Sequence, residues 1–249
     1  MQLIIAKDYG EMCAKAARLF AAEITLKPDC LLGLATGSTP VGLYDALIGK
    51  FAEGELDFSQ VRTVNLDEYA GLPGSHPQSY RYFMDHHLFD WVNIDKRNTY
   101  LPAGTAVDSE AECARYERQI EALGQVDIQL LGIGLNGHIG FNEPGDSFPA
   151  ATHVTDLAPS TIRANTRFFR SIDEVPTRAL TMGIGTILKA KKIVLLTNGA
   201  AKAETLYQMM YGPVTPQLPA SILQFHPDVV VFADEEAASV IRERTSADR

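Results

Sequence analysis

Short apolar runs alternate with stretches of helical periodicity along the whole chain. The runs are continuously apolar, which is typical of strands that are buried on both faces of a sheet. The predicted strands span residues 3–6, 31–35, 61–66, 126–133, 179–182, 192–197 and 229–233. Helical spacing of apolar residues predicts helices over residues 9–24, 40–51, 78–89, 111–123, 201–210 and 235–243. This order predicts an α/β fold with a mostly parallel central sheet flanked by helices, of the Rossmann-like type.

Two long polar stretches, residues 70–77 and 144–170, interrupt this alternation. Parallel strands need right-handed crossovers, and ligands bind at their carboxyl ends, where such loops lie. We therefore expect both stretches to be active-site loops, and residues 144–170 to form a lid. No repeat or Gly/Ser-rich linker divides the sequence, so we expect a single domain over residues 1–249.

The composition is that of an ordinary globular protein, with 46% hydrophobic and 21% charged residues. The net charge of −9 argues against binding to nucleic acid or to an anionic membrane, since both need a basic surface. No apolar segment approaches the ~18 residues of a membrane span, and the N-terminus becomes charged too early for a signal peptide. We interpret Cys13, Cys30 and Cys113 as buried or half-buried thiols in a reducing compartment. The expected location is therefore the cytoplasm.

The turn over residues 35–40 joins a predicted strand to a predicted helix. Gly37 permits an unusual backbone angle, and Thr39 can cap the helix. Amides and hydroxyls of Thr36, Gly37 and Ser38 converge where the helix dipole favours an anion, so the turn can bind a phosphate. By itself the segment is better interpreted as an ordinary strand-to-helix turn, because it lacks the length and the lysine of a Walker loop.

A second strand-to-helix turn, residues 197–202, changes this balance. It places Lys202 in the first helical turn, where a cation opposes the helix dipole unless it serves an anion. Arg163 and Arg167 lie four residues apart and share one face if that segment is helical, so either can complete a phosphate site. We interpret Arg163 as a solvated surface charge and retain Arg167.

Asp67 and Glu68 follow the predicted strand over residues 61–66. Enzymes of the α/β class keep catalytic groups at the carboxyl ends of strands, although an isolated Asp-Glu pair is more often only a polar strand terminus. Adjacent side chains point in different directions. One carboxylate can therefore face a pocket as a general base while the other makes structural hydrogen bonds.

The Gly-rich loop over residues 131–144 carries Asn136, His138 and Glu143. A histidine needs a carboxylate and a polar orienting group to carry protons near neutral pH, and this loop offers both. A lone histidine is more often structural, but the combination at the end of a strand favours catalysis. The other histidines show no metal-ligand spacing with His138 or with a cysteine pair, so we predict no metal site.

Three segments are more specific in combination than any one of them alone: Leu34-Ala-Thr-Gly-Ser-Thr-Pro40, Asn65-Leu-Asp-Glu-Tyr-Ala-Gly-Leu-Pro73 and Gly132-Ile-Gly-Leu-Asn-Gly-His-Ile-Gly-Phe-Asn-Glu-Pro144. They resemble the glucosamine-6-phosphate deaminase family. Later segments look like further motifs of that family: Ala164-Asn-Thr-Arg-Phe-Phe169, Ala179-Leu-Thr-Met-Gly-Ile-Gly185 and Leu223-Gln-Phe-His-Pro227. The similarity is collinear from about residue 3 to residue 231.

The resemblance implies that glucosamine 6-phosphate and water give fructose 6-phosphate and ammonia, without a metal or an organic cofactor. It implies that His138 assists opening of the sugar ring, that Asn136 and Glu143 hold and tune its imidazole, and that Asp67 moves a proton between C2 and C1. Phosphate binding is implied for a larger set of residues, namely Thr36, Gly37, Ser38, Arg167 and Lys202.

Two departures from the family pattern refine these expectations. Many members have Asp where this chain has Asn136, which can accept a hydrogen bond from the ring but brings no negative charge, so the imidazolium is less stabilised. Hexameric allosteric members carry basic residues soon after the Asn-Glu-Pro motif, whereas residues 151–156 here contain neither Arg nor Lys. We therefore expect no activation by N-acetylglucosamine 6-phosphate and a small assembly, most simply a monomer.

Two other functions stay open at this point. The nearer one is another sugar-phosphate enzyme of this fold, a lactonase or an isomerase. The related 6-phosphogluconolactonases share the fold and a similar Gly-x-Gly-x-x-Gly-His loop, although residues 66–69 and 141–144 fit the deaminases better. A non-catalytic sugar-phosphate sensor needs a DNA-binding segment, and the sequence offers no basic helix-turn-helix. The joint presence of Asp67, His138 and Glu143 also favours catalysis over sensing.

Overall fold

A seven-stranded parallel sheet forms the centre of the molecule, for which a computed structural model describes residues 1–247. Its strands follow the order β1-β10-β9-β6-β2-β3-β5, and every pairing is parallel. In chain order they are β1 (Gln2–Ala6), β2 (Leu31–Leu34), β3 (Arg62–Asn65), β5 (Thr99–Tyr100), β6 (Ile128–Leu131), β9 (Lys192–Thr197) and β10 (Val229–Asp234). The predicted parallel α/β fold is confirmed.

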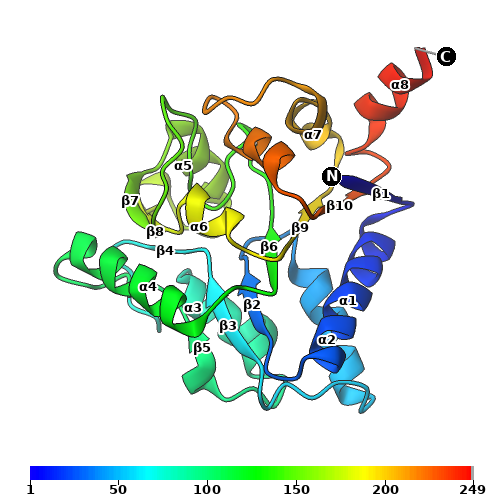
Figure 1. The fold of residues 1–249 in the computed structure, drawn as a ribbon. Coiled ribbons are helices and arrows are strands. Elements are labelled where there is room, and N and C mark those ends of the chain that lie inside the picture. Colours follow the sequence, from blue (N-terminus) through cyan, green and yellow to red (C-terminus); the bar gives the residue numbers. More distant parts are fainter. Residues whose placement is uncertain (248–249) are drawn as a thin grey trace.

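Helices cover both sides of this sheet (Figure 1). They are α1 (Tyr9–Leu26), α2 (Val41–Ala52), α3 (Tyr80–Met84), α4 (Ser109–Leu123), α5 (Pro159–Asn165), α6 (Ile184–Leu188), α7 (Ala203–Tyr211) and α8 (Ser239–Ala247). Helices α1 and α2 lie side by side on one side of the sheet, while α4 and α6 lie on the other (Figure 1). Asp8 begins α1 and Asp108 begins α4, because each side chain accepts a hydrogen bond from a backbone N–H of the first turn.

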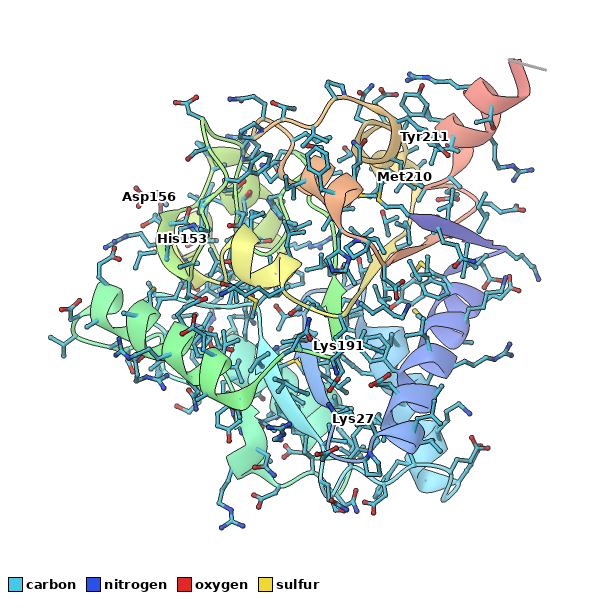
Figure 2. The ribbon with its side chains drawn as sticks, in the orientation of Figure 1. Lys27, His153, Asp156, Lys191, Met210 and Tyr211 are labelled. Carbon is cyan, nitrogen blue, oxygen red and sulfur yellow. The ribbon has the colours of Figure 1, made fainter. Side chains whose placement is uncertain are left out.

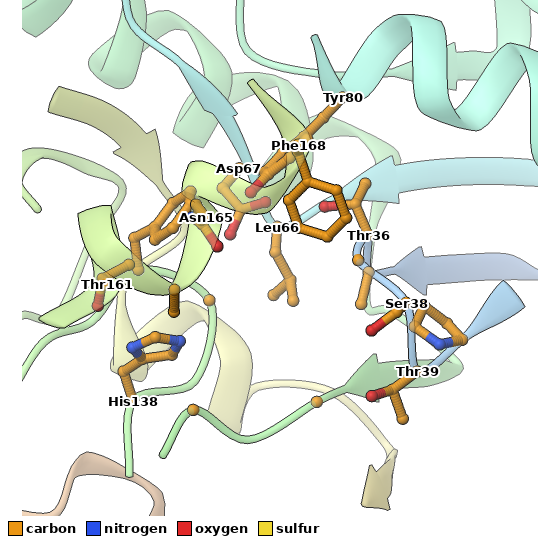
Figure 3. A pocket seen from close by; sticks show the side chains of 18 of the residues that line it. Thr36, Ser38, Thr39, Leu66, Asp67, Tyr80, His138, Thr161, Asn165 and Phe168 are labelled. Carbon is orange, nitrogen blue, oxygen red and sulfur yellow. The ribbon is translucent and has the colours of Figure 1, made fainter. Parts of the chain in front are cut away.

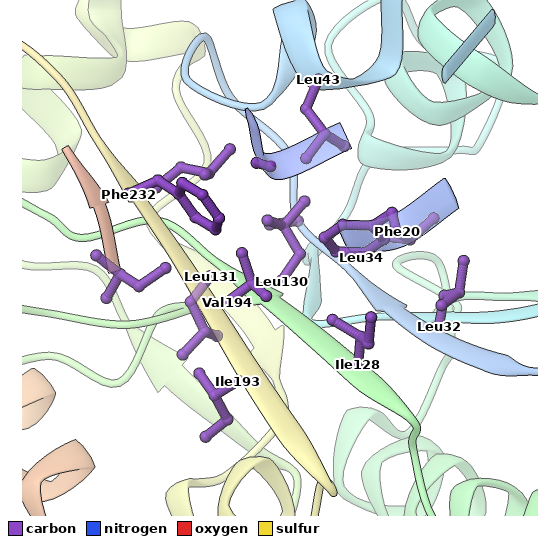
Figure 4. Close-up of a cluster of buried hydrophobic side chains, with 14 of the residues drawn as sticks. Phe20, Leu32, Leu34, Leu43, Ile128, Leu130, Leu131, Ile193, Val194 and Phe232 are labelled. Carbon is purple, nitrogen blue, oxygen red and sulfur yellow. The ribbon is translucent and has the colours of Figure 1, made fainter. Parts of the chain in front are cut away.

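The core lies between the central strands and these helices (Figure 4). Leu130 and Val194 on β6 and β9 are fully buried, as are Phe20 on α1 and Leu43 on α2. Each such side chain contributes roughly 1.5–3 kcal/mol by leaving water. Burial on both faces explains why the central strands are continuously apolar in the sequence.

A buried ion cluster joins the amino ends of the central strands. Asp127 precedes β6, its side chain is 1% exposed, and it binds Lys27 at 2.8 Å and Lys191 at 2.7 Å. It also accepts the backbone N–H of Leu31 at 2.8 Å, so one carboxylate connects β2, β6 and the start of β9. Lys27 and Lys191 lie on the same side of the molecule, away from α7 (Figure 2).

A second, three-stranded antiparallel sheet differs from the prediction. It consists of β4 (Asp67–Tyr69), β8 (Arg178–Thr181) and β7 (His153–Asp156), in the order β4-β8-β7. We expected residues 179–182 to join the parallel sheet, but Thr181 pairs with Asp67 and His153 instead. Only Leu66 separates β3 from β4, so the chain passes directly from the large sheet into the small one.

The polar stretch over residues 144–170 also contains more structure than predicted. It holds β7, α5 and a 3₁₀ turn (Thr166–Phe168). The polar side chains misled the interpretation, because β7 is a half-exposed edge strand and α5 is mostly exposed. The lid prediction therefore refers to a structured segment rather than a loop.

Two further observations concern the cysteines and membrane-spanning helices. Cys13, Cys30 and Cys113 are buried free thiols, as interpreted from their spacing. In the described range, residues 1–247, no helix has the length and apolar character needed to cross a membrane. That the chain forms a single domain stays a prediction.

Candidate active site

The predicted site residues gather around one cavity of about 800 Å³ at the carboxyl ends of β2, β6 and β9. Eight of the nine line it: Thr36, Gly37, Ser38, Asp67, Asn136, His138, Arg167 and Lys202. The ninth, Glu143, contacts His138 from behind. His138 and Ser38 lie on opposite sides of the cavity, with Asp67 between them (Figure 3).

His138 faces the cavity with one ring nitrogen and Glu143 with the other. Its Nδ1 lies 3.3 Å from Glu143 Oε2. An ionised carboxylate only accepts hydrogen bonds, so Nδ1 carries the hydrogen and Nε2 is left to exchange protons with a ligand. A Cβ at Gly134 would lie 2.5 Å from Nε2, so only glycine leaves room for the imidazole there.

Glu143 accepts hydrogen bonds at both carboxylate oxygens. Asn136 Nδ2 binds Oε2 at 2.7 Å, while Thr161 Oγ1 at 2.5 Å and the Ala158 N–H at 3.3 Å bind Oε1. Burial alone would raise the pKa of Glu143, but the hydrogen bond and charge of His138, with the donors Thr161 and Asn136, lower it to about 2. Glu143 is thus an anion at neutral pH.

Asn136 acts differently from the expectation that it accepts a hydrogen bond from the imidazole ring. Its Oδ1 accepts the backbone N–H of His138 at 3.3 Å, and its Nδ2 donates to Glu143. The donor to Glu143 is an amide N–H that an Asp at this position would lack. Asn136 therefore orients the Glu143 carboxylate and the backbone of His138. It influences the imidazole ring only through Glu143.

Asp67 is a desolvated carboxyl group at the cavity wall. The residue is 6% exposed, and its carboxyl oxygens make no hydrogen bond to another group within residues 1–247. Burial, and secondarily the charge of Glu68, raises the pKa of Asp67 well above its usual range. A carboxylate with a raised pKa is a stronger base, which suits proton transfer from carbon.

Glu68 has the structural role that was predicted for one member of the pair. Its carboxylate accepts the backbone N–H groups of Tyr69, Tyr80 and Arg81 at 2.8–2.9 Å. It thereby fixes the start of α3, whose Tyr80 ring stacks on Phe141 with centroids 5.9 Å apart. Tyr80 lies beside Asp67 at the cavity wall (Figure 3).

The first strand-to-helix turn presents unpaired backbone donors. The N–H groups of Gly37, Ser38 and Thr39 donate to no protein acceptor in the described part of the chain. Gly37 has a φ of +97°, which few other residues adopt, and this angle curls the turn around the donors. Three such groups beside a helix start form an anion-binding site.

The predicted capping role of Thr39 is wrong. Pro40 is the N-cap residue of α2, without a side-chain hydrogen bond, and the Thr39 hydroxyl instead donates to Asn198 Oδ1 at 3.2 Å. Because Asn198 follows β9, this bond connects the two turns that were predicted to share a phosphate.

The second turn supplies one cation to the same end of the cavity, and the 3₁₀ turn Thr166–Phe168 supplies another. Lys202 begins α7, and its ammonium donates to the Ile133 carbonyl at 2.6 Å. Burial, followed by the positive charge of Arg167, lowers the pKa of Lys202 to about 8. Arg167 reaches Ser38 Oγ at 3.4 Å, whereas Arg163 is exposed and lies outside the cavity lining, as interpreted from the sequence.

Several residues of the site were not recognised in the sequence. Thr161 and Asn165 lie in the polar stretch, and contact Glu143 and the Tyr69 hydroxyl across long sequence separations. The only available signal for Tyr80 was its position at the start of a predicted helix. No group of three or more His, Cys, Asp or Glu side chains within residues 1–247 is arranged to hold a metal ion.

Comparisons with known proteins agree with this geometry. The family model for glucosamine-6-phosphate isomerases/6-phosphogluconolactonase matches residues 7–231. Glucosamine-6-phosphate deaminases of Clostridium perfringens and Thermoanaerobacter pseudethanolicus are each 54% identical, over 97% of this chain and 100% and 95% of theirs.

Solved structures give the same result at the level of the fold. A monomeric glucosamine-6-phosphate deaminase superposes with a TM-score of 0.95 at 49% identity, covering 96% of this chain and 100% of its own. A 6-phosphogluconolactonase from Thermotoga maritima has a TM-score of 0.74 at 21% identity, covering 94% and 99%, and shares the fold alone. The chain therefore belongs to the glucosamine-6-phosphate isomerase/6-phosphogluconolactonase family and, within it, to the glucosamine-6-phosphate deaminases.

Proposed function

We propose that this protein converts glucosamine 6-phosphate and water into fructose 6-phosphate and ammonia. The observation that carries the proposal is the convergence of three groups on one cavity: a desolvated Asp67, the His138–Glu143 pair and a cluster of phosphate-type donors. An aldose-ketose isomerisation needs a base for a carbon acid and a proton carrier for the ring oxygen, held at fixed positions relative to an anchored substrate.

The phosphate binds at the two strand-to-helix turns. The unpaired N–H groups of Gly37, Ser38 and Thr39 and the hydroxyl of Thr36 approach the phosphate oxygens, while Arg167 and Lys202 supply positive charge. An incoming dianion stabilises the protonated form of Lys202, whose pKa is lowered by burial in the free protein. Anchoring this end of the sugar fixes where C1 and C2 lie.

Ring opening uses His138. Its Nε2 takes the proton from the anomeric hydroxyl and delivers it to the ring oxygen as the C1–O5 bond breaks. Glu143 keeps Nδ1 protonated and stabilises the imidazolium that forms between the two transfers. Thr161 and Asn136 keep the carboxylate in place for this purpose.

Isomerisation uses Asp67. The carboxylate removes the C2 proton of the open-chain aldehyde, which gives an enolamine, and returns a proton to C1, which leaves an imine at C2. Water adds to that imine and ammonia departs, so the C2 ketone of fructose 6-phosphate forms. Burial makes Asp67 basic enough for the first transfer, because its charge is poorly solvated until the proton arrives.

The direct test measures ammonia and fructose 6-phosphate from glucosamine 6-phosphate in separate coupled assays. Equal amounts of the two products support the proposal. Formation of a ketose phosphate without ammonia would identify a different isomerase, and hydrolysis of 6-phosphogluconolactone would identify a lactonase. Asp67→Asn is the negative control, because its amide cannot accept the C2 proton.

The proposal extends to assembly and location. A deaminase of very similar structure is described as monomeric, so we propose a monomer. The net charge of −9 gives no basic surface for nucleic acid or anionic lipid, and the free thiols suit the cytoplasm. Sedimentation at micromolar concentration tests the assembly. Sigmoidal kinetics that N-acetylglucosamine 6-phosphate makes hyperbolic would contradict the absence of an effector site.

A further inference from the structure

Tyr9, the first residue of α1, supports the turn over residues 36–40 from outside the cavity. Its hydroxyl oxygen lies 3.2 Å from the Ser38 carbonyl and 3.0 Å from the Thr39 carbonyl, and it accepts the Gly42 N–H at 2.9 Å. One phenol thus contacts three backbone groups of the turn and of the first residues of α2. Tyr9 does not line the cavity, so these contacts lie on the reverse side of the turn.

The geometry of the peptide bond links this contact to the ligand side. In a trans peptide, the C=O of one residue and the N–H of the next point in opposite directions. Holding the Ser38 carbonyl towards Tyr9 therefore points the Thr39 N–H away from Tyr9 and towards the cavity. Hydrogen bonding at the carbonyl also polarises the peptide, which makes its N–H a better donor to an anion.

The packing around Tyr9 indicates a fitted position. A Cβ at Gly42 would lie 2.9 Å from Cys13 Sγ and 3.1 Å from the Tyr9 hydroxyl oxygen, so glycine at position 42 lets the phenol reach the backbone. Burial is the main cause that raises the pKa of Tyr9, so its hydroxyl keeps its proton and remains a donor.

We propose that Tyr9 is a positioning residue for phosphate binding, which sets the direction of the backbone donors in the turn over residues 36–40. The inference deepens the proposed function, because that turn is the proposed phosphate anchor. Tyr9 touches neither the substrate nor the reacting atoms. It acts through the Ser38–Thr39 peptide.

Tyr9→Phe tests the proposal, because it removes the hydroxyl and keeps the ring. The loss of one neutral hydrogen bond corresponds to a change of about 3- to 10-fold in binding. We expect the Kd for inorganic phosphate and the KM for glucosamine 6-phosphate to rise together by that factor, while kcat at saturation stays within about two-fold. Phosphate binding by calorimetry needs no catalysis, so its result is separate from the fate of the proposed function.

Tyr116→Phe is the matched control. The Tyr116 hydroxyl likewise donates to two backbone carbonyls, those of Asn65 and Tyr100, but neither belongs to the turn over residues 36–40. It should lower the melting temperature without changing the phosphate Kd. Gly42→Ala is a second probe, since its methyl group displaces the phenol while the hydroxyl remains; it should weaken phosphate binding in the same direction. An unchanged phosphate Kd in both Tyr9→Phe and Gly42→Ala, or a fall in kcat without a change in KM, would overturn the proposal.

Discussion

Replacing Glu143 by Gln should separate the charge of this residue from its shape. The side chain is 10% exposed, and its two oxygens accept from different donors, Asn136 and His138 at Oε2, Thr161 and Ala158 at Oε1. A glutamine amide has one oxygen and one NH₂ group. Whichever way it turns, its NH₂ group faces two donors, so the variant loses the negative charge and creates a donor-donor conflict.

The size of the effect on stability follows from the pKa. An ordinary value of 4.5 against about 2 in the folded protein corresponds to about 3 kcal/mol of stability at pH 7. Because the folded pKa is the lower one, this contribution is present above pH 4.5 and is lost as the pH falls from about 4.5 through about 2. At pH 3.5 the same relation leaves about 2 kcal/mol. Because the Glu143 side chain is only 10% exposed, these two free energies are not reduced for solvent screening.

Two measurements check this reasoning. Urea unfolding of wild type and Glu143→Gln at pH 7 and pH 3.5 should give a difference that shrinks as the pH falls. The kcat for ammonia release should drop by roughly 10²–10⁴, the range for a disturbed proton-transfer pair. Wild-type kcat combined with a pH-independent stability difference would refute the assignment.

Glu117→Gln is the matched control. Glu117 accepts three hydrogen bonds where Glu143 accepts four; they come from the Thr152 N–H and hydroxyl and from the Thr186 hydroxyl, at 2.5–2.9 Å. It lies outside the cavity lining, and its hydrogen-bond donors are threonines rather than a histidine. The variant should be less stable while kcat stays within about two-fold, so a general response to lost hydrogen bonds can be recognised.

Three further variants test the remaining groups. Asp67→Asn should abolish ammonia release yet raise the melting temperature at pH 7. Burial and the charge of Glu68 raise the pKa of Asp67 in the folded protein. The stability that Asp67 contributes is therefore present below its pKa in the unfolded chain and is lost as the pH rises through its pKa in the folded protein. Equal melting temperatures of wild type and variant at pH 7 would contradict this. Phosphate binding at pH 8 should take up protons onto Lys202, whose pKa is about 8; calorimetry in two buffers measures the uptake, which Lys202→Met should remove. Thr161→Val deletes the 2.5 Å hydrogen bond to Glu143 and should lower kcat about ten-fold or more, with little change in KM; an unchanged kcat would exclude a positioning role.

The large sheet could be predicted because its strands carry their own signal. Leu130 and Val194 lie in continuous apolar runs, which few other structures produce at that length. Strand β4 carries no such signal, since Asp67, Glu68 and Tyr69 are mostly polar and their partners in β8 lie more than a hundred residues later in the sequence. Pairing over that separation depends on the tertiary structure, and no local pattern encodes it.

The sequence indicated which residues gather around the cavity but not which contacts they make. The loop with His138 and Glu143 was found because a histidine and a carboxylate in one short Gly-rich segment are chemically unusual. The hydrogen bond from Thr161 was beyond reach, because a threonine in a polar stretch has no feature that marks its partner. Asn136 lies beside His138 and Glu143, but whether its amide meets the imidazole or the carboxylate depends on how the loop folds, which no local pattern encodes.

The register between β2 and β3 gives the site a fixed length scale. Leu34 pairs with Asn65, so Thr36 and Asp67 each lie two residues beyond a matched pair on neighbouring strands, which run ~4.8 Å apart. The backbone hydrogen bonds between β2 and β3 therefore help to set the distance between the proposed phosphate anchor and the proposed base. A sugar whose phosphate is one carbon nearer to, or farther from, its amine would bind yet place the wrong carbon at Asp67. Discrimination by chain length then depends on strand register as well as on the side chains that line the cavity.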